Sequence, residues 1–176
     1  MSAWTKIART VVGASGAPTI VFSTIPASFT DLMLFCSFRT SSVGSYAGFT
    51  FNGTTSGYGG RLLFGSGSGN AATTEHATNE IQYFETNDST QTANTFNNGF
   101  LFMPNYNSSS NKLVSYDVVN ENNAVSAQQR ILAGFWNNNA AISSITIDSL
   151  TGDFVQYSSA TLYGITRGSS GGVTVS

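Results

Sequence analysis

The chain contains one histidine and one cysteine, the side chains best suited to act as a base or a nucleophile near neutral pH. His76 lies beside Glu75 in a segment of small and polar residues, and a Ser-His-Asp or Cys-His site would have to use it as the base. Cys36 lies inside a hydrophobic segment, which favours a buried apolar side chain over an exposed thiolate. We therefore expect an exposed loop histidine, a buried thiol and no catalytic residue.

Four carboxylates fall within one region of the chain, at Glu75, Glu80, Glu85 and Asp88. A glycosidase holds two carboxyl groups about 5–9 Å apart across a sugar cleft, so this region allows a small polysaccharide hydrolase as one alternative. Solvated loop charges are the simpler interpretation of the same residues. The sequence thus favours a protein that is not an enzyme.

Two oxygen-rich segments, Asn87-Asp88 and residues 120–123, could bind Ca²⁺, but neither has the spacing of an EF-hand loop. The glycine-rich segment 65–69 lacks the Lys-Ser or Lys-Thr pair of a phosphate-binding loop. Turn formation by Asn, Asp and Gly accounts for these segments. We expect no metal and no cofactor.

The composition narrows the classes of partner. Charged residues make up 9% of the chain, the net charge is −2, and Lys and Arg are not clustered, which argues against nucleic acid. No hydrophobic run reaches the roughly 18 residues of a membrane helix, and no signal peptide is visible at the start. The remaining polarity comes from Ser, Thr, Asn and Gly, which are poor in helix interiors and common in strands and turns.

Alternating aromatic and β-branched residues predict a succession of short strands separated by turn residues, typical of a β sandwich or barrel. Residues 65–79 are expected to form a flexible loop, and 168–176 a loose Gly/Ser-rich tail after a single sandwich domain at 1–167. The predicted strands are 19–25, 31–39, 46–51, 61–64, 80–85, 95–103, 112–120, 129–136, 142–150 and 160–166.

The predicted strand 31–39 is apolar on both of its faces. One face carries Leu32, Leu34, Cys36 and Phe38, and the other carries Met33 and Phe35. One face is expected to meet the sandwich core, so the other must be covered by a loop or by another subunit. In strand 112–120 the set Val114, Tyr116 and Val118 is the better core face.

A hairpin turn is predicted at Asn52-Gly53, because both residues tolerate positive φ. Strand 46–51 would lead into this turn and strand 61–64 would return from it.

Two stretches resemble a group of tailed-bacteriophage virion proteins with a jelly-roll sandwich. The first is Ile25-Pro26-Ala27-Ser28-Phe29-Thr30-Asp31-Leu32, followed by a strand ending Phe38-Arg39 and by Phe51-Asn52-Gly53. The second runs from Ile145-Thr146-Ile147 through Phe154 to Ala160-Thr161-Leu162-Tyr163-Gly164-Ile165. The group has a similar "F-x-x-I-P-x-x-Y-T-D-L" front and a closing "T-L-Y-G-I", and Phe29 stands where Tyr is common. Physically, Pro26 sets a corner, Asp31 can accept backbone N–H bonds there, and Gly164 lets a ring or backbone lie close.

The resemblance implies a virion part rather than a catalyst. We expect an antiparallel jelly-roll sandwich that forms a homotrimer and binds the major capsid protein as a head decoration (cement) protein on the capsid surface. The sandwich pattern fills nearly the whole chain, which favours this role over a fibre. The alternative is a tail-fibre or receptor-binding domain that contacts host glycans through loops such as Pro104–Asn111. The candidate interface residues are Trp4, Met33, Phe35 and Trp136, and either tryptophan could instead belong to the core.

Overall fold

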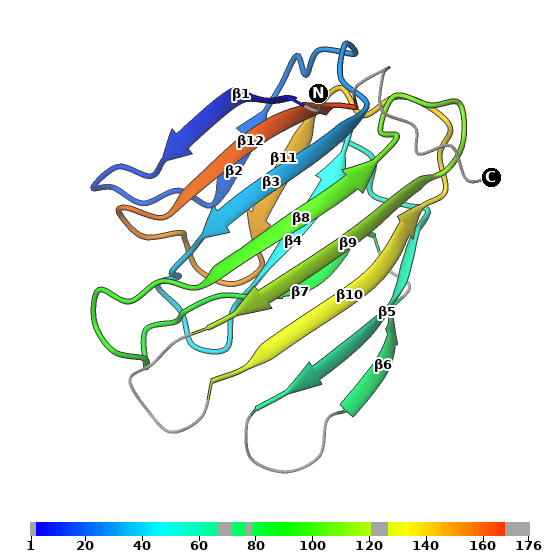
Figure 1. Cartoon of the computed structure of the whole chain (residues 1–176). Coiled ribbons are helices and arrows are strands. Elements are labelled where there is room, and N and C mark those ends of the chain that lie inside the picture. The colour runs from blue at the N-terminus through cyan, green and yellow to red at the C-terminus, as the bar shows by residue number, and fades with distance from the viewer. Residues whose placement is uncertain (1–2, 67–71, 77–78, 121–126, 168–176) are drawn as a thin grey trace, which may run out of the picture.

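The computed structural model describes residues 3–66, 72–76, 79–120 and 127–167. These residues form twelve strands and no helix. Two sheets pack face to face as a β sandwich, and neighbouring strands in each sheet are antiparallel (Figure 1). The prediction of an all-β sandwich is confirmed. The predicted tail, 168–176, lies outside the described residues.

The two sheets differ in width. The larger sheet has the order β1 (Ala3–Val11), β12 (Ser159–Thr166), β3 (Asp31–Ser37), β8 (Asn98–Pro104), β9 (Lys112–Val119), β10 (Gln129–Trp136), β5 (Tyr58–Gly65) and β6 (Ala72–His76). The smaller sheet has the order β2 (Thr19–Phe22), β11 (Ile145–Ser149), β4 (Tyr46–Phe51) and β7 (Ile81–Glu85).

Eight of these strands follow the winding of a jelly roll. If β5, β6, β9 and β10 are set aside and the other eight are renumbered along the chain, the larger sheet reads 1-8-3-6 and the smaller sheet reads 2-7-4-5. That is the order of two Greek keys wrapped into a jelly roll. The four additional strands extend the larger sheet beyond β8, so this sheet offers a wide outer surface (Figure 1).

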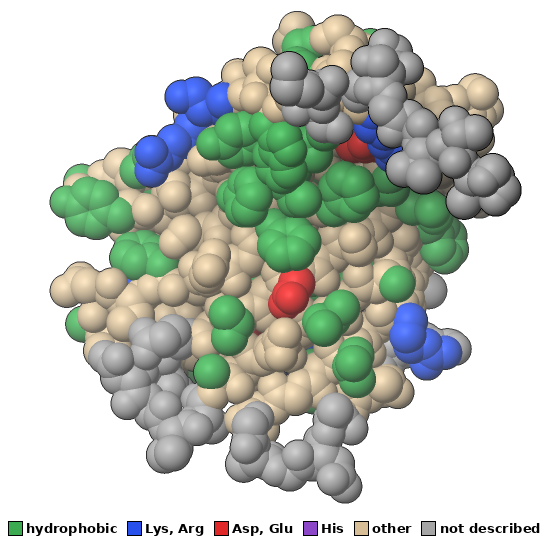
Figure 2. All heavy atoms as spheres, in the orientation of Figure 1, with side chains coloured by type: hydrophobic (Ala, Val, Ile, Leu, Met, Phe, Trp, Pro, Cys, Tyr) green, Lys and Arg blue, Asp and Glu red, His purple; other side chains and the backbone are tan. Residues whose placement is uncertain are grey.

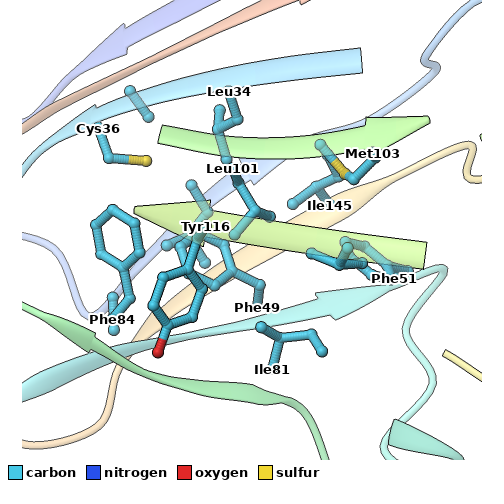
Figure 3. Packing of buried hydrophobic residues seen from close by; sticks show 14 of the residues in the cluster. Leu34, Cys36, Phe49, Phe51, Ile81, Phe84, Leu101, Met103, Tyr116 and Ile145 are labelled. Carbon is cyan, nitrogen blue, oxygen red and sulfur yellow. The ribbon is translucent and has the colours of Figure 1, made fainter. Parts of the chain in front are cut away.

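The core forms where the inward-facing residues of the two sheets meet. Strand β10 alternates strictly between exposed and buried residues, and in β9 the predicted set Val114, Tyr116 and Val118 is buried. Strand β3 buries Leu32, Leu34 and Cys36, while Phe35 stays 40% exposed. Figure 3 shows Leu34 and Leu101 from the larger sheet and Phe49 from the smaller sheet meeting between the layers. The predicted inner faces of these strands are therefore confirmed.

Two strands of the larger sheet were not predicted. A bulge at Ile7 interrupts the pairing of β1 with β12 between Lys6 and Ala8, so the inner and outer residues of β1 do not follow a simple alternation. Strand β6 consists of polar and small residues and was predicted as part of a loop. That prediction is wrong for Ala72–His76, because pairing with β5 rather than a sequence pattern makes the strand.

The predicted turn at Asn52-Gly53 is present, but the strands on its two sides do not pair, so the prediction of a hairpin is wrong. Both residues have positive φ, at 53° and 67°. Strand β4 pairs with β11 and β7, however, whereas β5 pairs with β10 and β6, so the turn carries the chain from one sheet to the other. The Asn52 carboxamide oxygen accepts the Ser143 and Ser144 N–H groups at 2.8 and 3.1 Å, which fastens the crossing to the segment before β11.

The motifs behind the resemblance have structural roles that agree with the sequence argument. The Phe29 ring lies directly on Gly164 of β12, where a Cβ would come within 2.3 Å of the ring carbons. The Asp31 carboxylate accepts the Asn105 backbone N–H at 2.9 Å and two bonds from the Arg167 guanidinium at 2.8 and 2.6 Å. Both motifs therefore brace the corner that leads into β3.

Candidate functional site

The outer surface of the larger sheet carries most of the exposed hydrophobic side chains of the described residues. We call this surface the outer apolar face; it comprises Trp4, Met33, Phe35, Leu63, Phe100, Phe102, Leu113, Val119, Ile131, Phe135 and Tyr163. Figure 2 shows hydrophobic side chains gathered on this side of the molecule. Single exposed apolar residues are ordinary, but a contiguous patch on a rigid sheet marks an interaction site.

Four aromatic side chains form the centre of the outer apolar face. The Phe35 ring lies 6.2 Å from Trp4, 5.9 Å from Tyr163 and 6.4 Å from Phe100, measured between ring centroids. Trp4 also lies 6.1 Å from Tyr163. The four rings come from β1, β12, β3 and β8, which are neighbours in the sheet, so the cluster is held in place by backbone pairing. Rigid aromatic clusters of this kind are typical of the energetically dominant part of a protein interface.

Charged side chains on this face lie on either side of the aromatic cluster. The strand registers place Arg9, Thr161, Phe35, Phe100 and Asp117 in one row across β1, β12, β3, β8 and β9. Because of the bulge at Ile7, Lys6 also lies on the outer side of β1. Figure 2 shows cationic side chains at several margins of the apolar group, the upper left among them, and an acidic side chain among the apolar ones.

The surface next to Asp117 is hollowed. One shallow hollow of about 340 Å³ is lined by Phe100, Asp117, Val119 and Gln129 among others. It shares Val119 and Gln129 with a second hollow of about 360 Å³ that reaches Ile131. The Gln129 side chain donates a long bond of 3.4 Å to the Asp117 carboxylate. A contacting chain could therefore seat apolar groups in the hollows and a donor or cation on Asp117.

Three of the four predicted interface residues lie on the outer apolar face. Trp4 is 52% exposed, Phe35 is 40% exposed, and Met33 is half-buried beside them. The prediction of Trp136 as an interface residue is wrong. Trp136 is a core residue: it is 1% exposed, and its indole stacks on the Tyr58 ring with 6.0 Å between the ring centroids. The reason is its position in β10, where even-numbered residues point inward.

The candidate nucleophile and base do not form a described site. Cys36 is buried in the core, as predicted, and burial raises the pKa of its thiol well above the usual value. The backbone of His76 lies in β6 rather than in a loop; its side chain is outside the described part of the structure.

Glu85 and Asp88 are bonded to structural partners. The Glu85 carboxylate pairs with the Arg130 Nε, and both side chains are 8% exposed. Burial raises the pKa of Glu85 more than the Arg130 charge lowers it. Burial also acts to raise the pKa of Asp88, but bonds from Thr90 and from the Gly44 N–H at 2.8 Å outweigh it, so the pKa is lowered. The prediction of solvated loop charges is wrong for these two residues, because both are buried.

Glu80 lies in a different environment. Its carboxylate covers Gly48 of β4 and accepts a bond from Gln82 at 2.8 Å. Burial and the nearby Asp148 charge raise the pKa of Glu80, and burial raises the pKa of Asp148. The side chain of Glu75 is outside the described part, so the hydrolase alternative stays an untested hypothesis.

A separate hollow of about 380 Å³ lies where the larger sheet extends past β7. It is lined by Tyr46, Leu62, Phe64, Tyr83 and Arg130, and we call it the aromatic hollow. The Arg130 guanidinium lies 4.7 Å from the Tyr46 ring centroid and 5.0 Å from that of Phe64. Tyr83 has a φ of 60°, an unfavourable value for a bulky residue, next to a register shift between β4 and β7. Sequence patterns did not indicate this hollow, because its residues come from four strands.

Among the described side chains, no three His, Cys, Asp or Glu residues gather closely enough to hold a metal ion. In the same part of the chain, no helix is long and apolar enough to cross a bilayer. The sequence suggested the loop 104–111 for glycan contact. The buried Lys112 ammonium holds this loop by donating a hydrogen bond to the Ser108 carbonyl at 2.8 Å. No protein-family model, curated protein or solved structure matches this chain.

Proposed function

We propose that this chain is a structural protein of a bacteriophage virion, a decoration protein that binds and stabilises the head shell. The observation that carries the proposal is the outer apolar face, with its cluster of Trp4, Phe35, Phe100 and Tyr163 held on four paired strands. A protein that leaves such a surface on a rigid sheet works by contact with other proteins. The resemblance of the 25–32 and 160–165 segments to virion jelly rolls supports the setting.

A decoration protein stabilises the head shell by mass action. A partner that binds the assembled shell but not its separated subunits raises the stability of the shell by RT ln(1 + [L]/Kd), where [L] is the free decoration protein. Several copies joined to each other would hold the shell more tightly than one copy, because the second contact is intramolecular. The sequence predicted three copies per assembly. Nothing tests that number, and the mass of the isolated chain in solution decides between three copies and two.

The test is to find the chain in intact particles. Purified heads and tails of the virus that encodes the chain are separated, and the protein is located by antibody labelling and by mass spectrometry of each fraction. We expect it on the heads, and we expect particles stripped of it to release DNA at lower temperature until the purified protein is added back. Its absence from heads, or heads whose heat resistance does not depend on it, would overturn the proposal.

The aromatic hollow favours a second candidate function, a receptor-binding domain that contacts host glycans. Tyr46, Tyr83 and Phe64 offer ring surfaces, and the tyrosine hydroxyls and Arg130 offer polar groups, the mixture that small-molecule sites use. Labelled protein that binds host cells, and loses this binding in Tyr46→Ala and Tyr83→Ala variants, would support this function over the first.

A further inference from the structure

We propose that the outer apolar face binds the same face of a second copy of this chain, about a two-fold axis that runs along β3. The inference rests on the proposal that this face works by contact between protein chains. It assigns the face to a second copy of the chain, so the dimer would bind the head shell through its remaining surface. It concerns the isolated protein in solution, so it can be tested without a viral particle.

A two-fold axis along β3 pairs strands that lie equally far from β3 on its two sides. Strand β12 then faces the partner's β8, and β1 faces the partner's β9, because the order is β1-β12-β3-β8-β9. Stacked sheets lie about 10 Å apart with their strands within about 30° of each other. A rotation about this axis does not change the position of a residue along the strand direction. The row from Arg9 to Asp117 in one copy therefore faces the same row in the second copy.

The apolar part of the row is self-complementary. Phe35 faces the partner's Phe35, and Thr161 faces the partner's Phe100. In the next row Met33 faces the partner's Met33, and Tyr163 faces the partner's Phe102. The aromatic cluster would thus be covered by an equivalent cluster, which explains why strand β3 is apolar on both of its faces.

The charges of the row are also self-complementary. Arg9 on β1 faces the partner's Asp117 on β9, and the two-fold axis repeats this pair on the other side. Each pair lies two strands, or about 10 Å, from the axis, where a 30° rotation displaces the residues by about 5 Å, within reach of an arginine side chain. If the partner were a different protein, nothing would require a cation at the position of Arg9. If the partner is a second copy, its Asp117 faces this position, and Arg9 supplies the opposite charge. Opposite charges set across an interface fix its register and exclude like-charged arrangements.

The size of the face suits a dimer. Five strands of about seven residues cover about 24 Å by about 24 Å, or roughly 580 Å² in flat projection. The accessible area of a surface made rough by side chains is larger than its projection, which brings it near the about 800 Å² per partner of a standard interface.

The experiment measures the mass of the whole chain by light scattering and sedimentation over a series of concentrations. We expect twice 18.6 kDa at the higher concentrations. Phe35→Lys should give the monomer. Val21→Lys places the same charge on an exposed position of β2 in the other sheet and should leave the dimer intact. Circular dichroism checks that both variants fold.

A charge exchange tests the pairing itself. Arg9→Asp and Asp117→Arg should each weaken dimerisation roughly 30-fold or more, and the double variant should return to within a few-fold of the native chain. The charge-exchange experiment does not depend on whether the Phe35→Lys variant folds. A native chain that stays monomeric or forms a trimer, or a double variant that is no better than the single ones, would overturn the inference. Either result could be obtained with the protein still located on heads, which would leave the proposed function standing.

Discussion

Gly164 shows how a single position can hold a corner of this fold. The Phe29 ring occupies the space where any other side chain of residue 164 would begin, and it joins the connection before β3 to the inner side of β12. Phe29 and Gly164 belong to the two separate stretches that carry the resemblance. Their contact gives a physical reason for the glycine at that place: a ring needs the room.

We expect Gly164→Ala to lower the free energy of unfolding by about 2 kcal/mol, because a new methyl group would overlap the Phe29 ring in a packed site. Urea unfolding followed by tryptophan fluorescence measures the change. Gly13→Ala is the matched control, since a Cβ there meets nothing within 4 Å. Equal stabilities for the two variants would show that the ring moves aside at no cost.

Arg39 organises the connection from β7 to β8. Its guanidinium donates to the carbonyls of Gln91 at 3.1 Å, Thr92 at 2.7 Å and Thr95 at 3.2 Å. Asn97 continues the fastening, because its carboxamide accepts the Phe38 N–H and donates to the Glu85 carbonyl. A side-chain amide thus links the residue that follows β3 with the last residue of β7, and these two strands lie in different sheets.

At the level of this connection, we expect Arg39→Met to release residues 88–97 while the sheets persist. A hydrogen bond that involves a charged group contributes about 1.5–3 kcal/mol. Arg39→Met removes three such bonds, so local opening of this connection should become much easier. Amide hydrogen exchange is the measurement, with faster exchange expected over 88–97. The loop 104–111, held by Lys112 instead, is the internal control and should keep its exchange rates. Unchanged exchange over 88–97 would show that the Arg39 hydrogen bonds do not hold this connection in place.

For the whole molecule, buried carboxyl groups determine how stability varies with pH. The pKa values of Glu80, Glu85 and Asp148 are raised, chiefly by burial. A group with a raised folded pKa contributes stability that is fully present below its unfolded pKa and is lost as pH rises through the folded value. Asp88 acts in the opposite direction: its contribution is lost only as pH falls through a pKa below the usual 3.8.

We therefore expect the free energy of unfolding to decrease as pH rises from about the ordinary carboxyl pKa of 4.5 toward neutrality. Urea unfolding at a series of pH values measures this slope. The double variant Glu80→Gln with Asp148→Asn should flatten it, because two of the three raised groups are gone. A stability that rises toward neutral pH in the native chain would contradict this assignment of charges.

The sequence was sufficient for the properties that repeat within one segment. Successive side chains of a strand point to opposite sides, so Leu34 against Phe35, or Tyr116 against its neighbours, already showed which residues enter the core. Composition and turn residues likewise indicated a sandwich. Asp31 and Gly164 were identified with roles that the structure supports.

Strand pairing, in contrast, joins residues far apart in the chain, and no local pattern encodes it. Asn52-Gly53 has the φ values of a hairpin turn but leads into the other sheet, β6 is a strand only because β5 pairs with it, and Trp136 is buried because of the side that β10 presents. The row from Arg9 to Asp117 exists only once five strands are in register. The candidate site is a property of that register, since hydrogen bonds between strands, and not the order of residues along the chain, decide which side chains become neighbours.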